Sequence, residues 1–459
     1  PDLHYLRARA HECALLRRAR AARTGTVRGD RGAHAPSKRV SEAARIVENV
    51  TCLGCGCACD DIAVVIDGAR IREARNACAL GVRWFGDGVL PGAIAGGRTA
   101  AIEDVLREIA AVLRAARAPL VFLAPDLTCE AQGAAIAIAD QLRAFVDGVT
   151  SSTAAEGILA SQRRGRASAT LGEIRNRADL IVFWAVNPAQ SYPRFQSRYA
   201  PDPAGVYLPR GRRDRTVIAV DVGAQRGPDD ADLRIQMTAE DEPLFLSSLR
   251  ASLAGRALGG KAMLARVTEL ASRLGKARYA AIVSDAESTP AGASGRADAL
   301  IALAQSLNAT TRAALCTLRA GGNRNGADTV LTWQTGFPMA VDFSRGAPRY
   351  EPERAAVARL REGAVDVVLL VGSAAAIPPA VRDTLGAVRT IVIGPRASEG
   401  ASASQIRIDT GVAGIHESGM ALRTDDVPLP VRAVLPTPRD TASLLEALGA
   451  AIAAQAGAA

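Results

Sequence analysis

Residues 101–459 are predicted to form doubly wound α/β sheets, preceded by a small β module that holds a metal or a cluster. Three observations lead to this prediction. Short apolar runs alternate with stretches of helical periodicity, which indicates parallel sheets covered on both faces. Residues 62–71 combine a β-branched run, an Asp67-Gly68 turn and a return strand, as in a β-hairpin. Five cysteines lie within residues 52–78, around that hairpin.

The cysteines are the densest chemical signal. Four of the eight fall within eight residues, and Cys78 follows the hairpin. Cys52, Cys55 and Cys59 have the spacing Cys-x2-Cys-x3-Cys, and with Cys78 they supply the four thiolates that a [4Fe–4S] cluster needs. Zinc held by four cysteines is the alternative, although zinc sites more often use two separated pairs. Unligated buried thiols are a third possibility. Cys57 is a surplus thiol, either a spectator or a substitute ligand.

The predicted elements of the α/β part follow in chain order. Helical periodicity covers residues 101–116, 129–146, 297–307 and 441–454. The predicted strands are residues 119–124, 179–184, 217–221, 233–237, 280–283, 365–372 and 389–394. Residues 411–435 are expected to form a turn-rich β segment. Ligands of such folds bind at the carboxyl ends of the strands.

Polar or glycine-containing segments stand where three of the predicted strands end. They are Asn187-Pro188, Asp221-Val222-Gly223 and Gly372-Ser373. Such positions carry binding loops in doubly wound sheets. The same residues also form ordinary turns, so each segment alone favours a turn over a ligand site.

Cys129 stands apart from the other cysteines, directly after a predicted strand and at the start of a helix. Thr128 or Asp126 can cap that helix. The helix dipole there favours a thiolate, which suits a nucleophile or a metal ligand. A packing role is equally compatible with a single cysteine. Cys316 lies in an apolar, strand-like context and is expected in the core.

Charge and length limit the function classes. Residues 1–46 contain eleven Lys or Arg against four acids, a net +7, whereas the remaining chain has 45 bases and 43 acids, a net +2. The basic balance therefore belongs to a tail, interpreted as upstream sequence, a transit peptide or a disordered arm, and nucleic-acid binding is not expected. A chain of 459 residues needs two to four domains. No apolar run is long enough for a membrane span, and a cytoplasmic protein is expected.

Histidine chemistry is nearly excluded. Three of the four histidines, and Cys13, lie in the basic tail, which leaves His416 in the body of the chain. Catalytic triads with a histidine base and histidine-rich zinc sites are therefore not expected. His416 is predicted at a turn or on the surface.

Longer motifs resemble one known family. The cysteine spacing before a hairpin, followed by doubly wound domains, is similar to the layout of molybdopterin and tungstopterin oxidoreductases. Four segments are similar to one member of that group, the B subunit of formylmethanofuran dehydrogenase. They are residues 183–188 (FWAVNP), 192–199 (YPRFQSRY), 318–326 (LRAGGNRNG) and 333–346 (WQTGFPMAVDFSRG). The Cys129-Glu130-Ala131-Gln132 segment looks like the one that carries the metal-ligating cysteine. The resemblance covers about residues 47–435 and rests on the motifs in combination.

The resemblance implies an organisation in domains and in subunits. The expected parts are a basic tail (1–46), a cysteine-rich cluster module (47–100), a first α/β domain (101–126 with 317–459) and a second α/β domain (127–316). In the family the last pterin-binding barrel is a separate subunit, so partners of the A, C and D type are expected, and methanofuran would bind through them. Faces that partners cover would be exposed, so the chain is expected to be soluble only in their company.

The resemblance also implies roles for residues. A [4Fe–4S] cluster would sit on Cys52, Cys55, Cys59 and Cys78, and Cys129 would ligate molybdenum or tungsten beside a molybdopterin or tungstopterin. Arg319 or Arg324 would orient formate through a bidentate guanidinium. The pterin phosphates would be held by backbone amides near Asn187 and Asp221. Pro188, Asn323 and Gly326 would also take part in binding the cofactor.

Two positions differ from that family pattern. Relatives that handle formate have a histidine after the metal-ligating cysteine, where this chain has Glu130, and many have a lysine after the fourth cluster cysteine, where it has Ala79. Two function classes stay open: a metallopterin subunit that interconverts formylmethanofuran with formate or CO2, and a redox-inactive scaffold subunit of a formyltransferase/hydrolase complex. A stand-alone zinc-binding α/β protein is a weaker alternative.

Overall fold

A three-stranded antiparallel sheet forms the first part of the structure. The computed structural model describes residues 44–256, 261–285, 295–399 and 406–456. Strands β1 (Arg45–Val50), β2 (Ile62–Asp67) and β3 (Arg70–Arg75) pair in that order, and α2 (Ala79–Phe85) follows them. The predicted hairpin is confirmed, and Gly68 takes the positive φ of 59° that its tight turn requires. The basic tail up to residue 43, with Cys13, lies outside the described residues.

A five-stranded sheet contains the middle of the chain. Its order is β10-β9-β8-β11-β12, and every pairing in it is parallel. The strands are β8 (Leu180–Trp184), β9 (Thr216–Val222), β10 (Leu233–Met237), β11 (Tyr279–Asp285) and β12 (Arg312–Leu318). From β8 the chain adds β9 and β10 on one side and β11 and β12 on the other. The topological switch point of this sheet is therefore at the carboxyl ends of β8 and β11.

A nine-stranded sheet combines segments from both ends of the described chain. Its order is β14-β13-β7-β6-β15-β16-β17-β4-β5, and β7 to β17 in this order are parallel. The strands are β4 (Ala93–Ala95), β5 (Arg98–Thr99), β6 (Pro119–Leu123), β7 (Phe145–Gly148), β13 (Val341–Asp342), β14 (Arg349–Tyr350), β15 (Val367–Val371), β16 (Arg389–Gly394) and β17 (Ile406–Asp409). A separate hairpin joins β18 (Gly419–Leu422) to β19 (Pro428–Val431).

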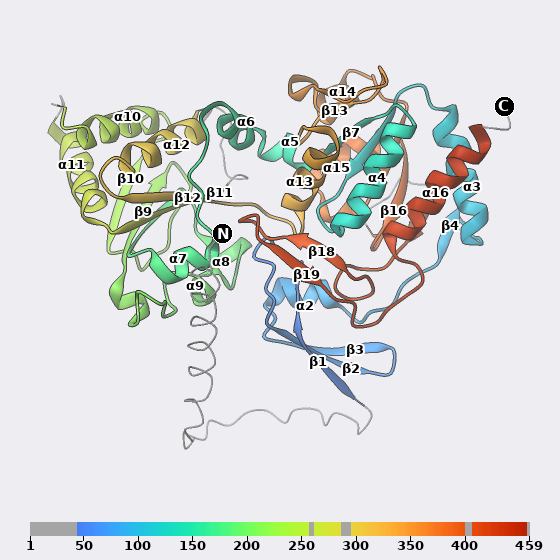
Figure 1. The fold of residues 1–459 in the computed structure, drawn as a ribbon, viewed down its shortest axis with the longest axis horizontal. Helices are drawn as coiled ribbons and strands as arrows, with labels where there is room; N and C mark the ends of the chain where they lie inside the picture. The colour runs from blue at the N-terminus through green and yellow to red at the C-terminus, as the bar shows by residue number, and fades with distance from the viewer. Residues whose placement is uncertain (1–43, 257–260, 286–294, 400–405, 457–459) are drawn as a thin grey trace, which may run out of the picture. The chain divides into compact units, whose positions relative to one another are not determined.

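Helices cover both faces of these sheets (Figure 1). Strand β6 shows why both faces need cover, because its apolar side chains point alternately to the two faces of the nine-stranded sheet. Val121 and Leu123 pack with α3, α4 and α16 on one face, and Leu120 and Phe122 pack with α14 and α15 on the other. On the five-stranded sheet, α10, α11 and α12 cover one face. The helices are α3 (Ile102–Ala115), α4 (Cys129–Gln141), α5 (Val149–Thr153), α6 (Ala155–Arg164), α7 (Leu171–Arg177), α8 (Pro188–Ser191), α9 (Phe195–Arg198), α10 (Glu242–Leu253), α11 (Lys261–Lys276), α12 (Arg296–Leu307), α13 (Arg324–Thr335), α14 (Ala356–Arg361), α15 (Pro379–Gly386) and α16 (Thr441–Ala456).

Two segments differ from the expected pattern. The helix predicted over residues 129–146 ends at Gln141, and β7 begins four residues later. The chain turns there through Arg143, whose φ is 52°, and the apolar residues that follow belong to a buried strand. In addition, β7 and β4 both pair within the nine-stranded sheet, although the sequence placed them in the second α/β domain and in the cysteine module. The division into domains as a whole stays a prediction.

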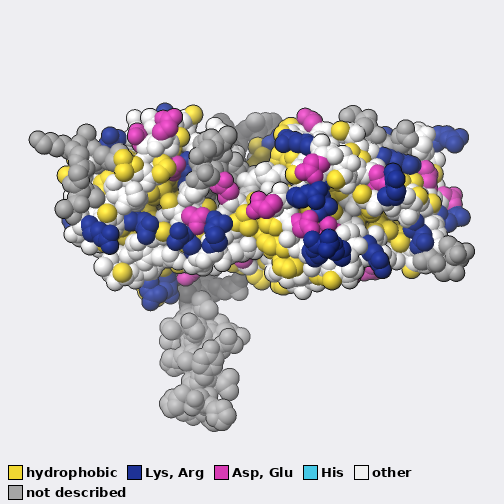
Figure 2. All heavy atoms as spheres, turned by 90° about the horizontal axis from the view of Figure 1, so that it is seen from above, with side chains coloured by type: hydrophobic (Ala, Val, Ile, Leu, Met, Phe, Trp, Pro, Cys, Tyr) yellow, Lys and Arg dark blue, Asp and Glu magenta, His cyan; other side chains and the backbone are white. Residues whose placement is uncertain are grey.

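Surface charge is mixed in sign. Figure 2 shows lysine and arginine side chains in several separate groups on one face, with acidic side chains between them. On this face the basic side chains do not merge into one continuous basic surface. In the described part of the chain, no helix combines the length and the apolar character needed to cross a bilayer.

Candidate functional site

The cysteine-rich loop connects β1 to β2 and closes on itself. The Cys52 amide donates to the Cys59 carbonyl at 2.8 Å, and the Ala58 amide donates to the Cys55 carbonyl at 3.1 Å. Gly56 is required at its position, because a Cβ there would lie 2.2 Å from the Arg319 carbonyl oxygen. The loop thus packs tightly between the hairpin and the end of β12.

The thiols of this loop influence one another. Burial raises the pKa of Cys52, and the nearby Cys55, Cys59 and Cys78 raise it further. Burial also raises the pKa of Cys59, to about 11, although Arg198 and Arg194 act against this change. The four predicted cluster ligands therefore share one neighbourhood, with Cys78 supplied from the residue before α2.

Cys57 now has a structural explanation. Its side chain is fully buried in the core that also contains β8 and β12, and it is hydrogen-bonded to Cys55. This bond raises the pKa of Cys57 well above its usual value and lowers that of Cys55. Tyr199 donates its hydroxyl to the Cys57 carbonyl at 3.4 Å. Cys57 is thus a core residue that supports its neighbour.

Two arginines clamp the end of the loop. Arg194 binds both carboxylate oxygens of Asp61, at 2.6 and 2.7 Å, and Arg198 pairs with Asp60 and Asp61. Burial opposes ionisation of Asp61, but the hydrogen bond from Arg194 and the charge of Arg198 outweigh it and lower its pKa. Both arginines belong to the YPRFQSRY motif, which therefore fixes the cysteine loop from a distance of more than 130 residues in sequence.

The fit of the loop to a metal or cluster is incomplete. Four soft thiol donors in one neighbourhood suit an iron–sulfur cluster chemically. However, among residues 44–256, 261–285, 295–399 and 406–456, no three or more His, Cys, Asp or Glu side chains are placed so that they could hold one metal ion together. The donor set suits a cluster, whereas the placement of the donors does not form a closed metal site.

Cys129 is the first residue of α4, and Thr128 caps this helix by accepting from the Ala131 amide at 3.2 Å. The expected stabilisation of a thiolate is not observed. The thiol is only 5% exposed, and burial raises the pKa of Cys129 to about 11, although a hydrogen bond from Asn323 acts in the opposite direction. Loss of water around the sulfur thus outweighs the helix end, and the thiol is neutral at pH 7.

Asn323 seals the space beside Cys129. Its amide nitrogen donates to the Leu127 carbonyl at 2.8 Å and lies 3.6 Å from the Cys129 sulfur. Its amide oxygen accepts from the Leu422 amide at 2.7 Å, so it also holds β18 in place. Gly326 is required next to it, because a Cβ there would lie 2.1 Å from the Asn323 side chain. Asn323 and Gly326, predicted to bind a cofactor, here close the site of the cysteine.

Glu130 has a structural partner as well. Its carboxylate accepts from the Met420 amide at 3.0 Å, at the start of β18. A Cβ at Gly419 would lie 2.4 Å from the same carboxylate oxygen, so the strand approaches the side chain closely. Glu130 therefore joins α4 to β18 and is already engaged in a bond within the chain.

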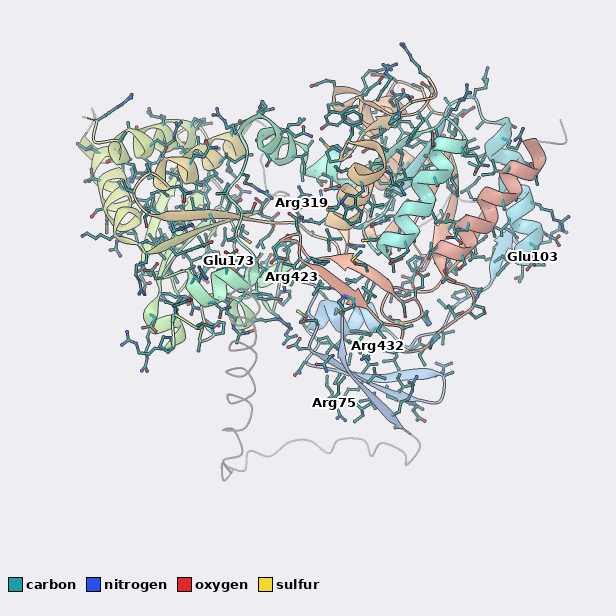
Figure 3. The ribbon with its side chains drawn as sticks, viewed as in Figure 1. Arg75, Glu103, Glu173, Arg319, Arg423 and Arg432 are labelled. Carbon is teal, nitrogen blue, oxygen red and sulfur yellow. The ribbon has the colours of Figure 1, made fainter. Side chains whose placement is uncertain are left out.

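The two arginines predicted to bind formate are buried and hydrogen-bonded. Arg319, at the end of β12, pairs with Asp328, and its amide donates to Thr424 at 3.0 Å, next to Arg423 (Figure 3). Arg324 donates to Thr150 at 3.0 Å. Burial lowers the pKa of Arg324 from its ordinary high value. Both guanidinium groups are thus engaged within the protein.

The predicted phosphate-binding residues of the five-stranded sheet also bond internally. Asn187 caps α8 by accepting from the Ala189 amide at 3.0 Å, and Pro188 is buried as the first residue of that helix. Asp221 is fully buried at the end of β9, where it accepts from the Gly227 amide and from Arg234, each at 2.8 Å. These contacts are those of turn and loop residues.

A cavity of about 320 Å³ lies at the carboxyl edge of the five-stranded sheet, where β11 and β12 end beside α5 and α12. Asp285 lines it, accepts from the Tyr192 hydroxyl at 3.3 Å, and has its pKa raised to about 6 by burial. Arg296 lines it too and binds Glu242 at 2.7 and 2.8 Å. Neither lining residue was predicted from the sequence, although Asp285 follows a predicted strand.

Cys316 and His416 are both buried. Cys316 lies in the core on β12, as expected, and burial raises its pKa to about 12. His416 lies in a turn, which is one of its two expected positions, and not on the surface, because it is only 5% exposed. Its Nδ1 accepts from the Val412 amide at 3.1 Å, and its Nε2 lies 2.9 Å from the Gly88 carbonyl oxygen. It fixes two loops to each other.

The two doubly wound sheets and the small antiparallel sheet with its cysteine-rich loop define a mixed α/β protein. No family model matches the chain. The B subunits of two tungsten-containing formylmethanofuran dehydrogenases 2 are each 31% identical, those of Methanocaldococcus jannaschii over 416 residues and of Methanococcus maripaludis over 417; each alignment covers 86% of this chain and 95% of the relative. The chain belongs to the family of formylmethanofuran dehydrogenase B subunits.

Two comparisons concern a bacterial complex. The B subunit of the formyltransferase/hydrolase complex Fhc of Methylorubrum extorquens is 29% identical over 325 residues, which are 69% of this chain and 84% of that protein. One chain in the crystal structure of the FhcABCD complex of the same organism, bound to methylofuran, aligns with a TM-score of 0.67 at 26% identity. That alignment covers 80% of this chain and 99% of the other.

Proposed function

We propose that this chain is the B subunit of a complex of the formylmethanofuran dehydrogenase or formyltransferase/hydrolase type, acting in methanofuran-linked one-carbon metabolism in the cytoplasm. The support is the near full-length similarity to B subunits of both kinds. The similar chain in the FhcABCD structure is one component of a larger assembly that binds methylofuran. Partners of the A, C and D type therefore supply the remaining parts of the site.

Within this complex we propose that the chain is a redox-inactive scaffold. The observation that carries this proposal is the closed surrounding of Cys129. A metal-ligating cysteine must present a thiolate toward a space that the metal can enter. Here Cys129 is 5% exposed, and its sulfur lies 3.6 Å from the amide nitrogen of Asn323, which covers it. Glu130, which replaces the histidine of the family pattern, is bound to Met420.

The competing candidate is a redox subunit, and one observation favours it. The alignment with the tungsten-containing enzymes covers 86% of the chain, against 69% for the bacterial protein. In that case Cys52, Cys55, Cys59 and Cys78 would hold a [4Fe–4S] cluster that supplies electrons. Cys129 would have to lose its proton and its contact with Asn323, and Arg319 its pairing with Asp328, before either could serve a metallopterin or formate. The stand-alone zinc protein is not proposed, because the chain belongs to a family of complex subunits.

One experiment on the chain co-purified with its partner subunits distinguishes the scaffold role from the redox role. Metal analysis, electron paramagnetic resonance and formyl transfer are measured for the native chain, for Cys129→Ala, and for Cys316→Ala as the buried-thiol control. The scaffold predicts neither tungsten nor molybdenum, and equal formyl transfer in all three complexes. About one tungsten or molybdenum and about four iron atoms per chain, with loss of the tungsten or molybdenum in Cys129→Ala alone, would establish the redox role instead.

A further inference from the structure

A second cavity, of about 480 Å³, lies at the opposite edge of the five-stranded sheet. Tyr279 and Arg312 are the first residues of β11 and β12 and lie opposite each other in the parallel register. The charged and aromatic side chains of its lining are Glu173, Arg177, Tyr207, Arg278, Tyr279 and Arg312. The cavity is therefore at the amino edge, away from the carboxyl ends where the family-predicted residues stand.

The charge of this cavity is positive and only partly compensated. Within the described residues, neither Arg177 nor Arg312 has an ion pair with a carboxylate, whereas Arg278 contacts Asp179 at 3.3 Å. The single acid in the lining, Glu173 on α7 (Figure 3), is already engaged, because it forms a capping box with Thr170. Two guanidinium groups thus remain able to donate to an anion.

Two phenol rings give the cavity a second chemical character. Tyr207 is 59% exposed, and the Arg177 guanidinium lies 5.4 Å from the centre of its ring. An exposed aromatic ring beside cations offers a face on which a flat ring can stack. Tyr279 is partly buried, and its hydroxyl is protonated at neutral pH, as a phenol ordinarily is; burial raises its pKa further, to about 12. It can therefore donate a hydrogen bond to an anion at neutral pH.

We propose that this amino-edge cavity binds a small phosphate monoester carried on a planar ring, the chemistry of a mononucleotide. The phosphate accepts hydrogen bonds from Arg312 and the Tyr279 hydroxyl, and the planar ring stacks on Tyr207 beside Arg177. The size agrees, because sites for molecules of this class are typically about 300–1,000 Å³. This site is independent of the proposed scaffold role and requires no metal.

The test uses the full chain co-purified with its partner subunits. Equilibrium dialysis compares adenosine 5′-monophosphate, adenosine and inorganic phosphate, and a poly-glutamate peptide serves as an acidic polymer. We expect the nucleotide to bind at least about tenfold more tightly than each of the other three, because it alone uses both the cations and the ring. Arg312→Gln and Tyr207→Leu should each weaken nucleotide binding by about tenfold or more.

Arg389→Gln is the matched control. Arg389 is the exposed first residue of β16 and lines a cavity of about 340 Å³ at the amino edge of the nine-stranded sheet, where no tyrosine is present in the lining. This variant should bind the nucleotide as the native chain does. The proposal is overturned if Arg389→Gln weakens binding equally, if binding survives both Arg312→Gln and Tyr207→Leu, or if phosphate or poly-glutamate binds as tightly as the nucleotide. Equal melting temperatures exclude unfolding as the cause of any loss.

Discussion

The carboxyl edges of the two large sheets differ in the space that they leave for a ligand. At the nine-stranded sheet, strand-end loops bond to one another: Asp126 accepts from the Ser373 amide at 3.1 Å, and Asn323 bonds to Leu422 and Leu127. At the five-stranded sheet, Asp285 and Arg296 line an open cavity of about 320 Å³. One edge is closed by the protein itself and the other has room for a ligand. The position of a residue at a strand end is therefore not enough to make it a ligand-binding residue.

The largest effect on stability is expected from a substitution that removes hydrogen bonds at the closed edge, that of the nine-stranded sheet. Asn323→Ala removes the partners of the Leu422 amide and the Leu127 carbonyl in a fully buried position. We expect a loss of about 2 to 5 kcal/mol in the free energy of unfolding, because two buried backbone groups become unsatisfied. Ser284→Ala, at the open edge, should change it by less than about 0.5 kcal/mol. Chemical denaturation measures both, and equal effects would contradict the contrast between the edges.

The second prediction concerns pH. Glu417 follows β17 at the closed edge and accepts from the Thr441 amide at 2.6 Å, and burial raises its pKa to about 7. The folded state therefore binds the carboxyl proton of Glu417 more tightly than the unfolded state does. Protonated Glu417 contributes its full stabilisation below about pH 4.5, and this contribution is lost as the pH rises toward 7.

Glu417→Gln should therefore reduce this pH dependence, by up to about 1.4 kcal/mol per pH unit. The remaining slope should come from other buried acids whose pKa is raised, among them Asp126, at about 7, and Asp285, at about 6. Unfolding measured between about pH 5 and pH 8 checks this expectation. An unchanged slope in Glu417→Gln would mean that the glutamate is ionised in the folded protein.

The smallest effects on stability are expected from glycine-to-alanine substitutions, one at each edge. Gly419→Ala would place a Cβ 2.4 Å from the Glu130 carboxylate and 3.0 Å from Thr128, so a loss of about 1 to 2 kcal/mol is expected. Gly157→Ala, in α6 beside the open cavity, meets no atom within 4 Å. It should stabilise the protein by about 0.5 to 1 kcal/mol, because alanine is the better helix former. Melting temperatures that move in the same direction would contradict the difference in packing.

Much of the fold could be predicted, because apolar runs identify buried parallel strands directly. The short strands β4, β5, β13 and β14, which form the two ends of the nine-stranded sheet, were not predicted, since two or three residues carry no periodic signal. Strand β7 was assigned to a helix because its apolar residues continue the helical pattern, and the turn at Arg143 leaves no mark in the sequence. Hydrophobic pattern thus identifies long elements, whereas turns and edges depend on tertiary pairing.

The candidate site was predicted only in part. The helix start at Cys129 follows from local sequence, but the raised pKa of its thiol depends on burial by distant parts of the chain. The hydrogen bond from Asn323, which lies 194 residues further along the chain, acts against this rise. The surroundings of Cys57 likewise depend on Tyr199. Burial and long-range hydrogen bonds decide the ionisation of these groups, and a linear motif contains neither. The roles assigned to the site residues and the cytoplasmic location stay predictions.

The strand order of the two sheets also has a consequence for the order in which they can fold. All strands of the five-stranded sheet lie between Leu180 and Leu318, so its pairings are complete once that segment has left the ribosome. The nine-stranded sheet must wait, because β6 at residue 119 pairs with β15 at residue 367, and β4 pairs with β17. During synthesis β6 can pair with β7, and β4 with β5, but their second partners, β15 and β17, follow only after more than 200 further residues. The waiting strands are apolar, so this interval is when the chain is most exposed to aggregation.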